Sequence, residues 1–254
     1  MAEVLKAYQL RLERFLESFP EEFGYPLEDP FDDMVEMLAE RRAFSFARFG
    51  DGEFFAVLGE SGENCDGHGY HPELGRRLGE ILAAKPAYLT GLQPLAVMRH
   101  GVEPIRTRSH GIRWVYSDSL HSALLDGRLD RFFDALKRLP VVLVGPPHLH
   151  SFAVEKAWLF AEVAYGDCWP QYEALKRLLA PWARVDGVIF LFCASMTSNV
   201  LIDDLHKANP RNTYIDVGSV FDPFVGIASR VYHDAIRDAL PMVEEVNPAT
   251  GARR

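Results

Sequence analysis

Short apolar runs that alternate with helix-like segments constrain the fold of this chain more than any other feature. Val141–Gly145 and residues 188–193 are unbroken apolar runs, which are typical of parallel strands buried on both faces. Similar runs cover residues 44–49, 87–92, 112–116, 161–165 and 214–217. Apolar residues recur at helical spacing in the segments between them. This alternation predicts an α/β fold, a Rossmann-like three-layer sandwich with a mostly parallel sheet.

Two N-terminal helices are predicted to form a cap over the core. Apolar residues recur at helical spacing from residue 5 to residue 19, and Pro20 is expected to end this first helix. Asp29 and Pro30 are expected to cap and open the second helix. We place the cap at residues 1–42 and the Rossmann-like core at residues 43–240. The 254 residues contain no repeat or linker, so a single domain over residues 1–254 is expected.

Further helices are predicted over residues 119–139, 171–179 and 229–240. Pro181 is expected to stop the helix at 171–179, and Ser151 is the expected cap of another helix. Each of these helices lies beside a predicted strand in the chain, as the crossovers of a parallel sheet require.

The loop after the first core strand carries the residues that best suit chemistry. The run at 44–49 ends at Gly50, and Asp51 and Glu53 follow it. Ligands bind at the carboxyl ends of the strands in open α/β sheets. Two carboxylates there can share a hard cation such as Mg²⁺ with substrate phosphates. They would suit the start of a helix equally well, with Asp51 as N-cap and Glu53 in the first turn, and their spacing leaves both interpretations open.

Candidate phosphate contacts lie near two strand ends. Arg48 precedes Gly50, and a guanidinium there offers bidentate contacts to diphosphate oxygens, although a surface role is also open. Ser195, Thr197 and Ser198 lie where the strand at 188–193 passes into a helix. The exposed N–H groups and positive end of a helix start form a natural phosphate site.

Two carboxylates near the last strand are candidates for a catalytic base. Asp216 belongs to the run at 214–217, and Asp222 follows it, directly before Pro223. Either residue would also serve as a cap, and Asp222 in particular could start a helix.

A zinc site is a weaker interpretation of the polar loop at residues 59–70. Cys65, His68 and His71 recur at three-residue intervals, but no fourth ligand has a clear place. His148 and His150 are interpreted as loop histidines rather than ligands.

Composition and missing motifs exclude several classes of function. The chain lacks the glycine-rich dinucleotide fingerprint, the P-loop and the nucleophile elbow. Its net charge of −9 makes nucleic acid an unlikely partner, although four arginines gather at residues 99–113. Three cysteines without paired spacing, no signal sequence and no apolar run of about 20 residues favour a cytoplasmic protein without a membrane span.

The residues after the first core strand resemble a known family. The segment from Arg48 to Glu53 is RFGDGE, and it is similar to the segment that contains the D-x-E metal motif of bacterial glycosyltransferases of the GT-D structural type. Residues 193–196 (CASM) and 214–219 (YIDVGS) resemble later parts of that family's pattern, so the likeness extends from about residue 44 to residue 222.

The resemblance implies a Rossmann-like fold and a nucleotide-sugar donor, commonly a UDP-sugar. It also implies Mn²⁺ or Mg²⁺ bridging Asp51 and Glu53 to the donor diphosphate. With it, Arg48, Gly50 and the 195–198 junction become the expected donor-binding residues. The leading hypothesis is a hexosyltransferase-type glycosyltransferase acting on a glycan or glycoconjugate. A metal-dependent phosphoester or pyrophosphate hydrolase and a non-catalytic nucleotide- or glycan-binding module are the alternatives.

Overall fold

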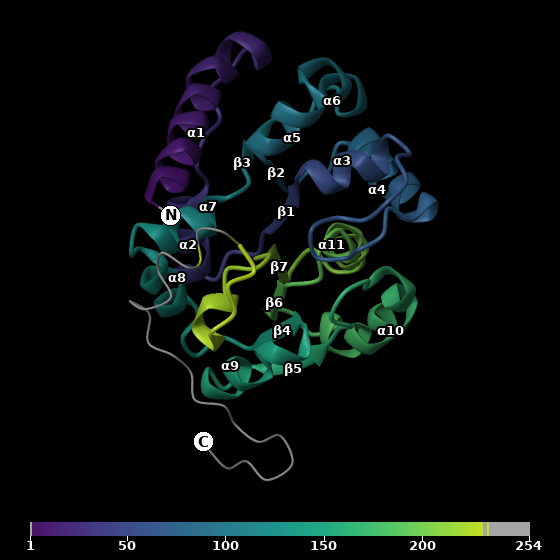
Figure 1. Ribbon diagram of the computed structural model, residues 1–254. Helices are drawn as coiled ribbons and strands as arrows, with labels where there is room; N and C mark the ends of the chain where they lie inside the picture. Colours follow the sequence, from purple (N-terminus) through teal and green to yellow (C-terminus); the bar gives the residue numbers. More distant parts are fainter. Residues whose placement is uncertain (1, 231–232, 234–254) are drawn as a thin grey trace.

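A parallel sheet forms the centre of the protein (Figure 1). The computed structural model describes residues 2–230 and residue 233, and within these residues seven strands pair in the order β3-β2-β1-β7-β6-β4-β5. Every strand pair is parallel. The strands are β1 (Ser45–Phe49), β2 (Leu89–Leu92), β3 (Trp114–Tyr116), β4 (Val141–Gly145), β5 (Leu159–Glu162), β6 (Ile189–Phe192) and β7 (Thr213–Asp216). The predicted α/β class and parallel sheet are confirmed.

Helices cover both faces of the sheet. Successive residues of a strand point to opposite faces, so Val142 and Val144 of β4 join one apolar cluster while Val141 and Leu143 join the other. The first cluster includes residues from α1 (Ala2–Phe23), α3 (Asp51–Val57), α4 (Pro72–Ala84), α5 (Pro94–His100), α6 (Val102–Arg108), α10 (Tyr172–Ala183) and α11 (Thr197–Ala208). The second includes residues from α2 (Phe31–Ala39), α7 (Ser119–Leu125), α8 (Leu129–Leu136) and α9 (His150–Glu155). These two helical layers and the sheet form the predicted three-layer sandwich.

The direction of strand addition reverses between β1 and β7. Strands β1, β2 and β3 follow one another towards one edge of the sheet, and β4 to β7 form the other half of the sheet. The β1–β7 pairing is short and comprises Ser45 with Tyr214 and Phe46 with Ile215. Beyond these pairs the carboxyl ends of β1 and β7 are not paired with each other. Such a switch point is where open α/β sheets bind their ligands.

The N-terminal segment covers the edge of the sheet at β3. The Trp114 N–H donates to the Tyr25 hydroxyl at 2.8 Å, and the Tyr116 N–H donates to the Glu28 carbonyl at 2.8 Å. The segment between α1 and α2 therefore takes up backbone donors that an open edge strand would expose.

Two prolines predicted to end helices lie inside them instead. Helix α1 continues from Pro20 to Phe23, and α10 continues from Pro181 to Ala183. A proline inside a helix removes one hydrogen bond and costs about 3 kcal/mol. In α1 this cost is offset by packing, since Phe19 is fully buried and stacks on Phe23 with ring centroids 4.2 Å apart. The predicted helix end at Pro20 was therefore wrong, whereas α10 does end near Pro181, at Ala183.

Other helix boundaries also differ from the prediction. The helix expected at 119–139 is split into α7 and α8 around Gly127, whose φ of +70° is incompatible with a continuous helix. Helix α2 begins at Phe31, one residue later than expected, while the Asp29 carboxylate accepts the Phe31 N–H at 3.0 Å. Ser151 lies inside α9 rather than at its cap.

Three predictions concern other parts of the chain. The strand expected at 161–165 occurs at Leu159–Glu162. Apart from Ser229, Arg230 and His233, the helix expected at 229–240 lies outside the described residues. None of the helices in the described part of the chain is long and apolar enough to cross a membrane.

Candidate functional site

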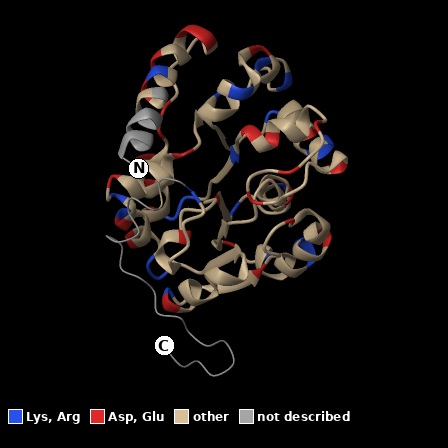
Figure 2. Ribbon diagram, viewed as in Figure 1, with Lys and Arg blue, Asp and Glu red and all other residues tan. Residues whose placement is uncertain are grey.

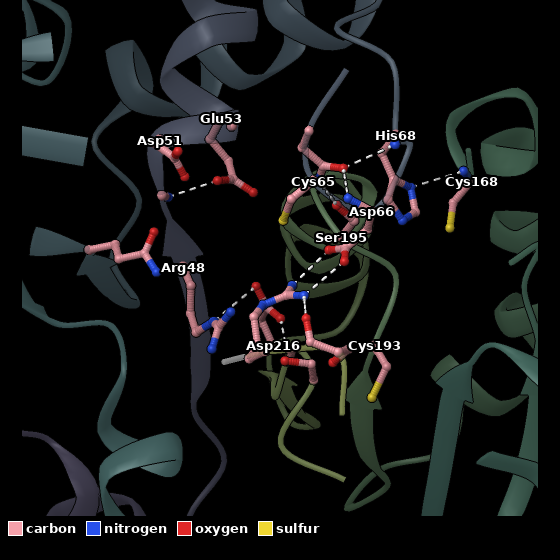
Figure 3. A pocket seen from close by; sticks show the side chains of 18 of the residues that line it. Arg48, Asp51, Glu53, Cys65, Asp66, His68, Cys168, Cys193, Ser195 and Asp216 are labelled. Carbon is pink, nitrogen blue, oxygen red and sulfur yellow. Dashed lines mark hydrogen bonds and ion pairs between the residues drawn. The ribbon is translucent and has the colours of Figure 1, made fainter. Parts of the chain in front are cut away.

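A cavity of about 500 Å³ opens at the carboxyl ends of the strands around the switch point. Residues predicted from three separate parts of the sequence line it together: Arg48, Gly50, Asp51, Glu53, Ser195, Asp216 and Asp222. Figure 3 shows the side chains of several of these residues arranged around one space. The parallel sheet produces this convergence, because all its strands end at the same edge.

Asp51 and Glu53 lie in the first turn of α3. Gly50 is the N-cap, and the Glu53 carboxylate folds back to accept the Gly50 N–H at 2.7 Å (Figure 3). Positions i and i+2 of a helix do not share a face. Glu53 nevertheless turns its carboxylate back to the helix start, and both residues line the cavity. A helix-start role and a ligand role are thus compatible, although Asp51 is the first helical residue rather than the N-cap.

Helix α4 holds α3 in place through a close backbone approach. A Cβ atom at Gly75 of α4 would lie 2.1 Å from the Ala56 carbonyl oxygen of α3, so only glycine allows this packing. This contact holds the C-terminal end of α3 against α4.

Two carboxyl groups line this end of the cavity. Burial, with a further contribution from the nearby Asp216 carboxylate, raises the pKa of Glu53 to about 7, although the Gly50 N–H acts in the opposite direction. Asp51 attracts a positive charge, since the Arg99 Nε lies 3.1 Å from its Oδ2. The pair of carboxylates is therefore a place where a cation lowers the electrostatic free energy.

Arg48 is held at the end of β1 by a side chain from α11. Its N–H donates to Asn199 Oδ1 at 3.2 Å, and Asn199 Nδ2 donates to its carbonyl oxygen at 2.7 Å. Asn199 thus supplies backbone partners at the point where β1 has parted from β7. The Arg48 guanidinium extends over Gly218, where a Cβ atom would lie 2.5 Å from Nη2.

The Arg48 side chain contacts two buried titratable groups. Its Nε lies 3.5 Å from Asp216 Oδ2, and its Nη1 lies 3.1 Å from His121 Nδ1. Burial and the charge of Arg48 lower the pKa of His121 well below its usual value. The neutral imidazole can therefore accept a hydrogen bond from Arg48. Burial raises the pKa of Asp216, while Arg48 acts to lower it.

The junction between β6 and α11 uses most of its hydroxyl groups internally. Ser195 lines the cavity, has a φ of +49°, and accepts a hydrogen bond from Asn64 Nδ2 at 3.0 Å. Thr197 and Ser198 are buried and are not among the lining residues, and the Ser198 Oγ accepts the Ala194 N–H at 3.1 Å. Of the three predicted side chains, the structure places Ser195 at the cavity and the other two in the packing of the junction.

Asp222 forms a second polar group on the cavity wall. It begins the short 3-10 helix Asp222–Val225, and its carboxylate accepts hydrogen bonds from His148 Nε2 at 3.0 Å and Ser229 Oγ at 2.5 Å. His148 was predicted as a loop histidine. It lies in the 3-10 helix Pro147–Leu149 directly after β4 and also lines the cavity.

The predicted zinc ligands do not converge. His71 pairs with Asp167, His68 Nδ1 accepts the Cys168 N–H at 3.4 Å, and Cys65 is exposed. Among residues 2–230 and 233, no three His, Cys, Asp or Glu side chains are grouped to hold a metal ion. The histidines instead tie the loop at 59–70 to the loop after β5.

Arg230 is a cavity residue that sequence reasoning missed. Its Nη1 and Nη2 lie 2.8 and 2.7 Å from the two carboxylate oxygens of Asp66, a bidentate ion pair that joins distant parts of the chain. His121 and Asn199 were missed for the same reason, since their partners are 73 and 151 residues away in the sequence. The spacing of residues within a short segment does not predict such contacts.

Basic residues gather along α5 and α6 (Figure 2). Arg99, Arg106 and Arg108 belong to these helices, and Arg99 lines the cavity. Arg113 pairs instead with Glu28 at 3.3 Å. Their grouping in sequence therefore reflects two surface helices, one of which reaches the cavity.

Comparison with known proteins supports the fold. No protein-family profile and no curated protein sequence matches the chain. A solved structure presented as "The highly conserved domain of unknown function 1792 has a distinct glycosyltransferase fold" is similar, with a TM-score of 0.61 and 16% identity. The similarity covers 76% of this chain and 78% of that one.

"A New Glycosyltransferase (DUF1792) from Streptococcus sanguinis" is similar with a TM-score of 0.57 and 18% identity, over 76% of this chain and 81% of that one. At this level of identity the similarity establishes the fold. The chain therefore shares the α/β fold of these structures.

Proposed function

We propose that the protein is a metal-dependent glycosyltransferase that moves a sugar from a UDP-sugar donor to a glycan or glycoconjugate. The observation that carries the proposal is the placement of Asp51 and Glu53. They lie together at the start of α3, beside Arg48, in the cavity at the switch point of a glycosyltransferase-type sheet. The likeness of residues 48–53 to the GT-D segment supports the same assignment.

Asp51 and Glu53 suit a divalent cation shared with a substrate. Carboxylate oxygens are the ligands that Mg²⁺ and Mn²⁺ favour, and Mg²⁺ is usually held by one or two carboxylates together with phosphate oxygens. The Arg99 guanidinium beside Asp51 indicates that this position attracts positive charge. Bound there, Mn²⁺ or Mg²⁺ would act as a Lewis acid that neutralises charge on the leaving diphosphate.

Other residues of the cavity are suited to hold the diphosphate itself. Arg48 and Arg230 bring two guanidinium groups to the cavity, and each can form bidentate contacts with phosphate oxygens. Ser195, which lines the cavity just before α11, adds a hydroxyl group. Gly50 suits this crowded position, because a Cβ atom there would lie 2.6 Å from Gln93 Oε1 and 3.1 Å from Glu53 Oε2.

Asp216 and Asp222 are the candidates for the base if the reaction inverts the anomeric centre. The base takes the proton of the acceptor hydroxyl as its oxygen bonds to the anomeric carbon. The bond from that carbon to the diphosphate oxygen breaks, and its electron pair leaves with the diphosphate. Asp216 faces Arg48 and is suited to position it, whereas Asp222 faces His148 and Ser229 on another part of the wall.

A thermal-shift screen of nucleotide sugars with and without Mn²⁺ tests the proposal. A ligand that binds only the folded protein raises its apparent stability by mass action. We expect UDP-sugars to raise the melting temperature in Mn²⁺ more than sugars linked to other bases, and more than they do in EDTA. Product analysis then separates the alternatives, since a hydrolase releases free sugar or sugar phosphate and transfers no sugar to an added acceptor. The absence of any Mn²⁺-dependent shift would contradict the proposal.

A further inference from the structure

The cavity has aromatic side chains at two different places. Phe55 and Tyr70 stack with ring centroids 5.4 Å apart on the side of α3, and both line the cavity. Tyr165 follows β5 and also lines the cavity, although β5 is separated from β1 by three intervening strands. Four strand spacings correspond to about 19 Å along the sheet. The two aromatic groups therefore flank the charged centre of the cavity.

Tyr165 presents an unusually open ring. It is 75% exposed, the largest exposed fraction among the large apolar side chains of the described residues. One edge contact orients it, because the ring of His148 meets it at 5.7 Å and 75°. A single exposed tyrosine is unremarkable on a protein surface. This one stands at the wall of a cavity, in contact with an ordered polar group.

That polar group is a chain of hydrogen bonds that ends on Asp222. His148 donates to one oxygen of the Asp222 carboxylate at 3.0 Å, and Ser229 donates to the other at 2.5 Å. Asp222 is thus held in one orientation by two donors from different segments. An aromatic face lies beside this fixed carboxylate and imidazole. We call Tyr165, His148, Asp222 and Ser229 the Tyr165 arm.

The composition of the Tyr165 arm matches a sugar ring. A pyranose has one face of polarised C–H groups, which packs on the negative face of an aromatic ring. Its rim carries hydroxyl groups, which need carboxylate and imidazole partners. A surface that bound a peptide or lipid would instead need a longer apolar groove or exposed backbone groups.

The Tyr165 arm also lies away from the part of the cavity where the proposed donor binds. A diphosphate that shares a cation with Asp51 and Glu53 must lie on the α3 side, where the Phe55–Tyr70 stack is available to the nucleotide base. The Tyr165 arm follows β4, β5 and β7 and has no part in that cation site. The Tyr165 arm is therefore available to the second substrate, the acceptor.

We propose that the Tyr165 arm is the acceptor subsite and that the acceptor group bound there is a pyranose sugar. The inference rests on the proposed function and adds the place in the cavity where the acceptor sugar binds. The sugar stacks on Tyr165, and its reactive hydroxyl lies against Asp222.

Saturation-transfer NMR on the full chain tests the proposal, with the methyl glycosides of glucose, galactose, N-acetylglucosamine and rhamnose as probes. UDP and Mn²⁺ are present throughout. We expect at least one glycoside to receive saturation from the wild-type protein. In Tyr165→Ala its affinity falls about 10-fold, whereas Tyr165→Phe keeps the ring and the affinity. Leu159→Ala is the matched control, because Leu159 is 53% exposed on β5 but does not line the cavity.

Calorimetric titration of UDP in the same samples separates this proposal from the proposed function. Unchanged UDP affinity in Tyr165→Ala, together with the lost glycoside signal, supports the assignment. Weaker UDP binding in Tyr165→Ala would place the nucleotide on Tyr165 and overturn it. Glycoside binding that is absent from the wild type, or equal in Tyr165→Ala, would overturn it as well. A wild-type protein that does not bind UDP at all would refute the proposed function itself.

Discussion

Two aspartates of this protein each lie beside an arginine, but their pKa values are shifted in opposite directions. Asp204 lies on α11, and its carboxylate is 2.7 Å from both Arg77 and Lys176. These hydrogen bonds and charges outweigh its partial burial and lower its pKa. Asp216, at the end of β7, is 3.5 Å from Arg48, and burial raises its pKa. The basic partners of Asp204 outweigh its burial and favour the charged carboxylate, whereas burial outweighs Arg48 at Asp216 and disfavours it.

The difference separates a structural ion cluster from a candidate site. The Asp204 cluster joins α4, α10 and α11 at the surface, where each carboxylate oxygen has a charged donor. Asp216 lies in a cavity wall with Arg48, which is also close to His121. Titratable groups whose pKa values are shifted by burial beside a cavity are typical of functional sites, whereas ion clusters in which every oxygen has a partner stabilise the fold. Variants of the two regions should therefore affect different measurements.

The largest effect is expected from the carboxylates beside Asp216. Asp51→Asn and Glu53→Gln should each lower the rate of sugar transfer about 1000-fold, because each removes charge from the cation site. Glutamine can still accept the Gly50 N–H, so the folded state should persist. The rate is followed by UDP release, and urea unfolding monitors stability. An equal loss of rate in Asp204→Asn, the control from the other cluster, would contradict the distinction.

Among the variants that affect the donor, Arg48→Lys should have the next largest effect. Lysine keeps the positive charge but cannot form two parallel hydrogen bonds to a diphosphate, so UDP should bind about 10-fold more weakly. Arg77→Lys makes the same exchange in the Asp204 cluster and should leave UDP affinity unchanged. Both affinities are measured by calorimetric titration in Mn²⁺. If the two variants bind UDP equally well, Arg48 does not contact the donor.

Asp204→Asn should reduce stability rather than activity. The variant loses charge-assisted hydrogen bonds, which lowers the free energy of unfolding by about 2 kcal/mol at pH 7. Because the pKa of Asp204 is lowered in the folded state, its stabilising contribution is present above the unfolded pKa. That contribution disappears as the pH falls through the folded pKa.

The difference in free energy of unfolding between the wild type and Asp204→Asn should therefore become smaller at acidic pH. Urea unfolding at several pH values measures this difference.

Asp216→Asn should behave in the opposite way. Because the pKa of Asp216 is raised in the folded state, its charged form lowers the stability of the folded protein at a pH above that pKa. Protonation at lower pH removes this cost. At pH 7 Asp216→Asn should consequently cost less stability than Asp204→Asn. The reverse order would refute the contrast between the two aspartates.

The smallest effect is expected at Arg99. An exposed ion pair such as that with Asp51 contributes about 0–1 kcal/mol, so its removal in Arg99→Ala should strengthen the binding of Mn²⁺ alone by up to about 5-fold. Arg106→Ala removes a charge from the neighbouring α6 without touching Asp51. Electron paramagnetic resonance of free Mn²⁺ measures both affinities. Weaker Mn²⁺ binding in Arg99→Ala would show that Arg99 assists the cation.

The sequence predicted the sheet well because the signals for buried strands are local. The unbroken apolar run of β4 and the short run before Gly50 both became strands, and the residues just beyond them line the cavity. Helix ends were harder to predict. Pro20 and Pro181 are tolerated inside helices because tertiary packing outweighs the local cost, and that packing is not visible in a short segment.

In the candidate site, too, local sequence patterns predicted some residues, whereas others depend on contacts between distant segments. Asp51 and Glu53 could be predicted because strand end, glycines and carboxylates are contiguous. The contacts of Arg230 with Asp66 and of His148 with Asp222 join residues that are 164 and 74 positions apart. Ser198 was placed among the ligands because hydroxyl groups suit phosphate, yet its own turn uses the oxygen. Such pairings depend on how the strands are ordered in the sheet, which the sequence alone does not determine.

Calorimetric titration with UDP tests the central claim most directly, because it measures the cation site without requiring the correct donor sugar or acceptor. We predict that the wild-type protein binds UDP in Mn²⁺ and that EDTA, Asp51→Asn or Glu53→Gln each weakens binding about 100-fold while the melting temperature of the unliganded protein stays the same. UDP affinity that is the same in Mn²⁺, in EDTA and in both variants would contradict the assignment of Asp51 and Glu53.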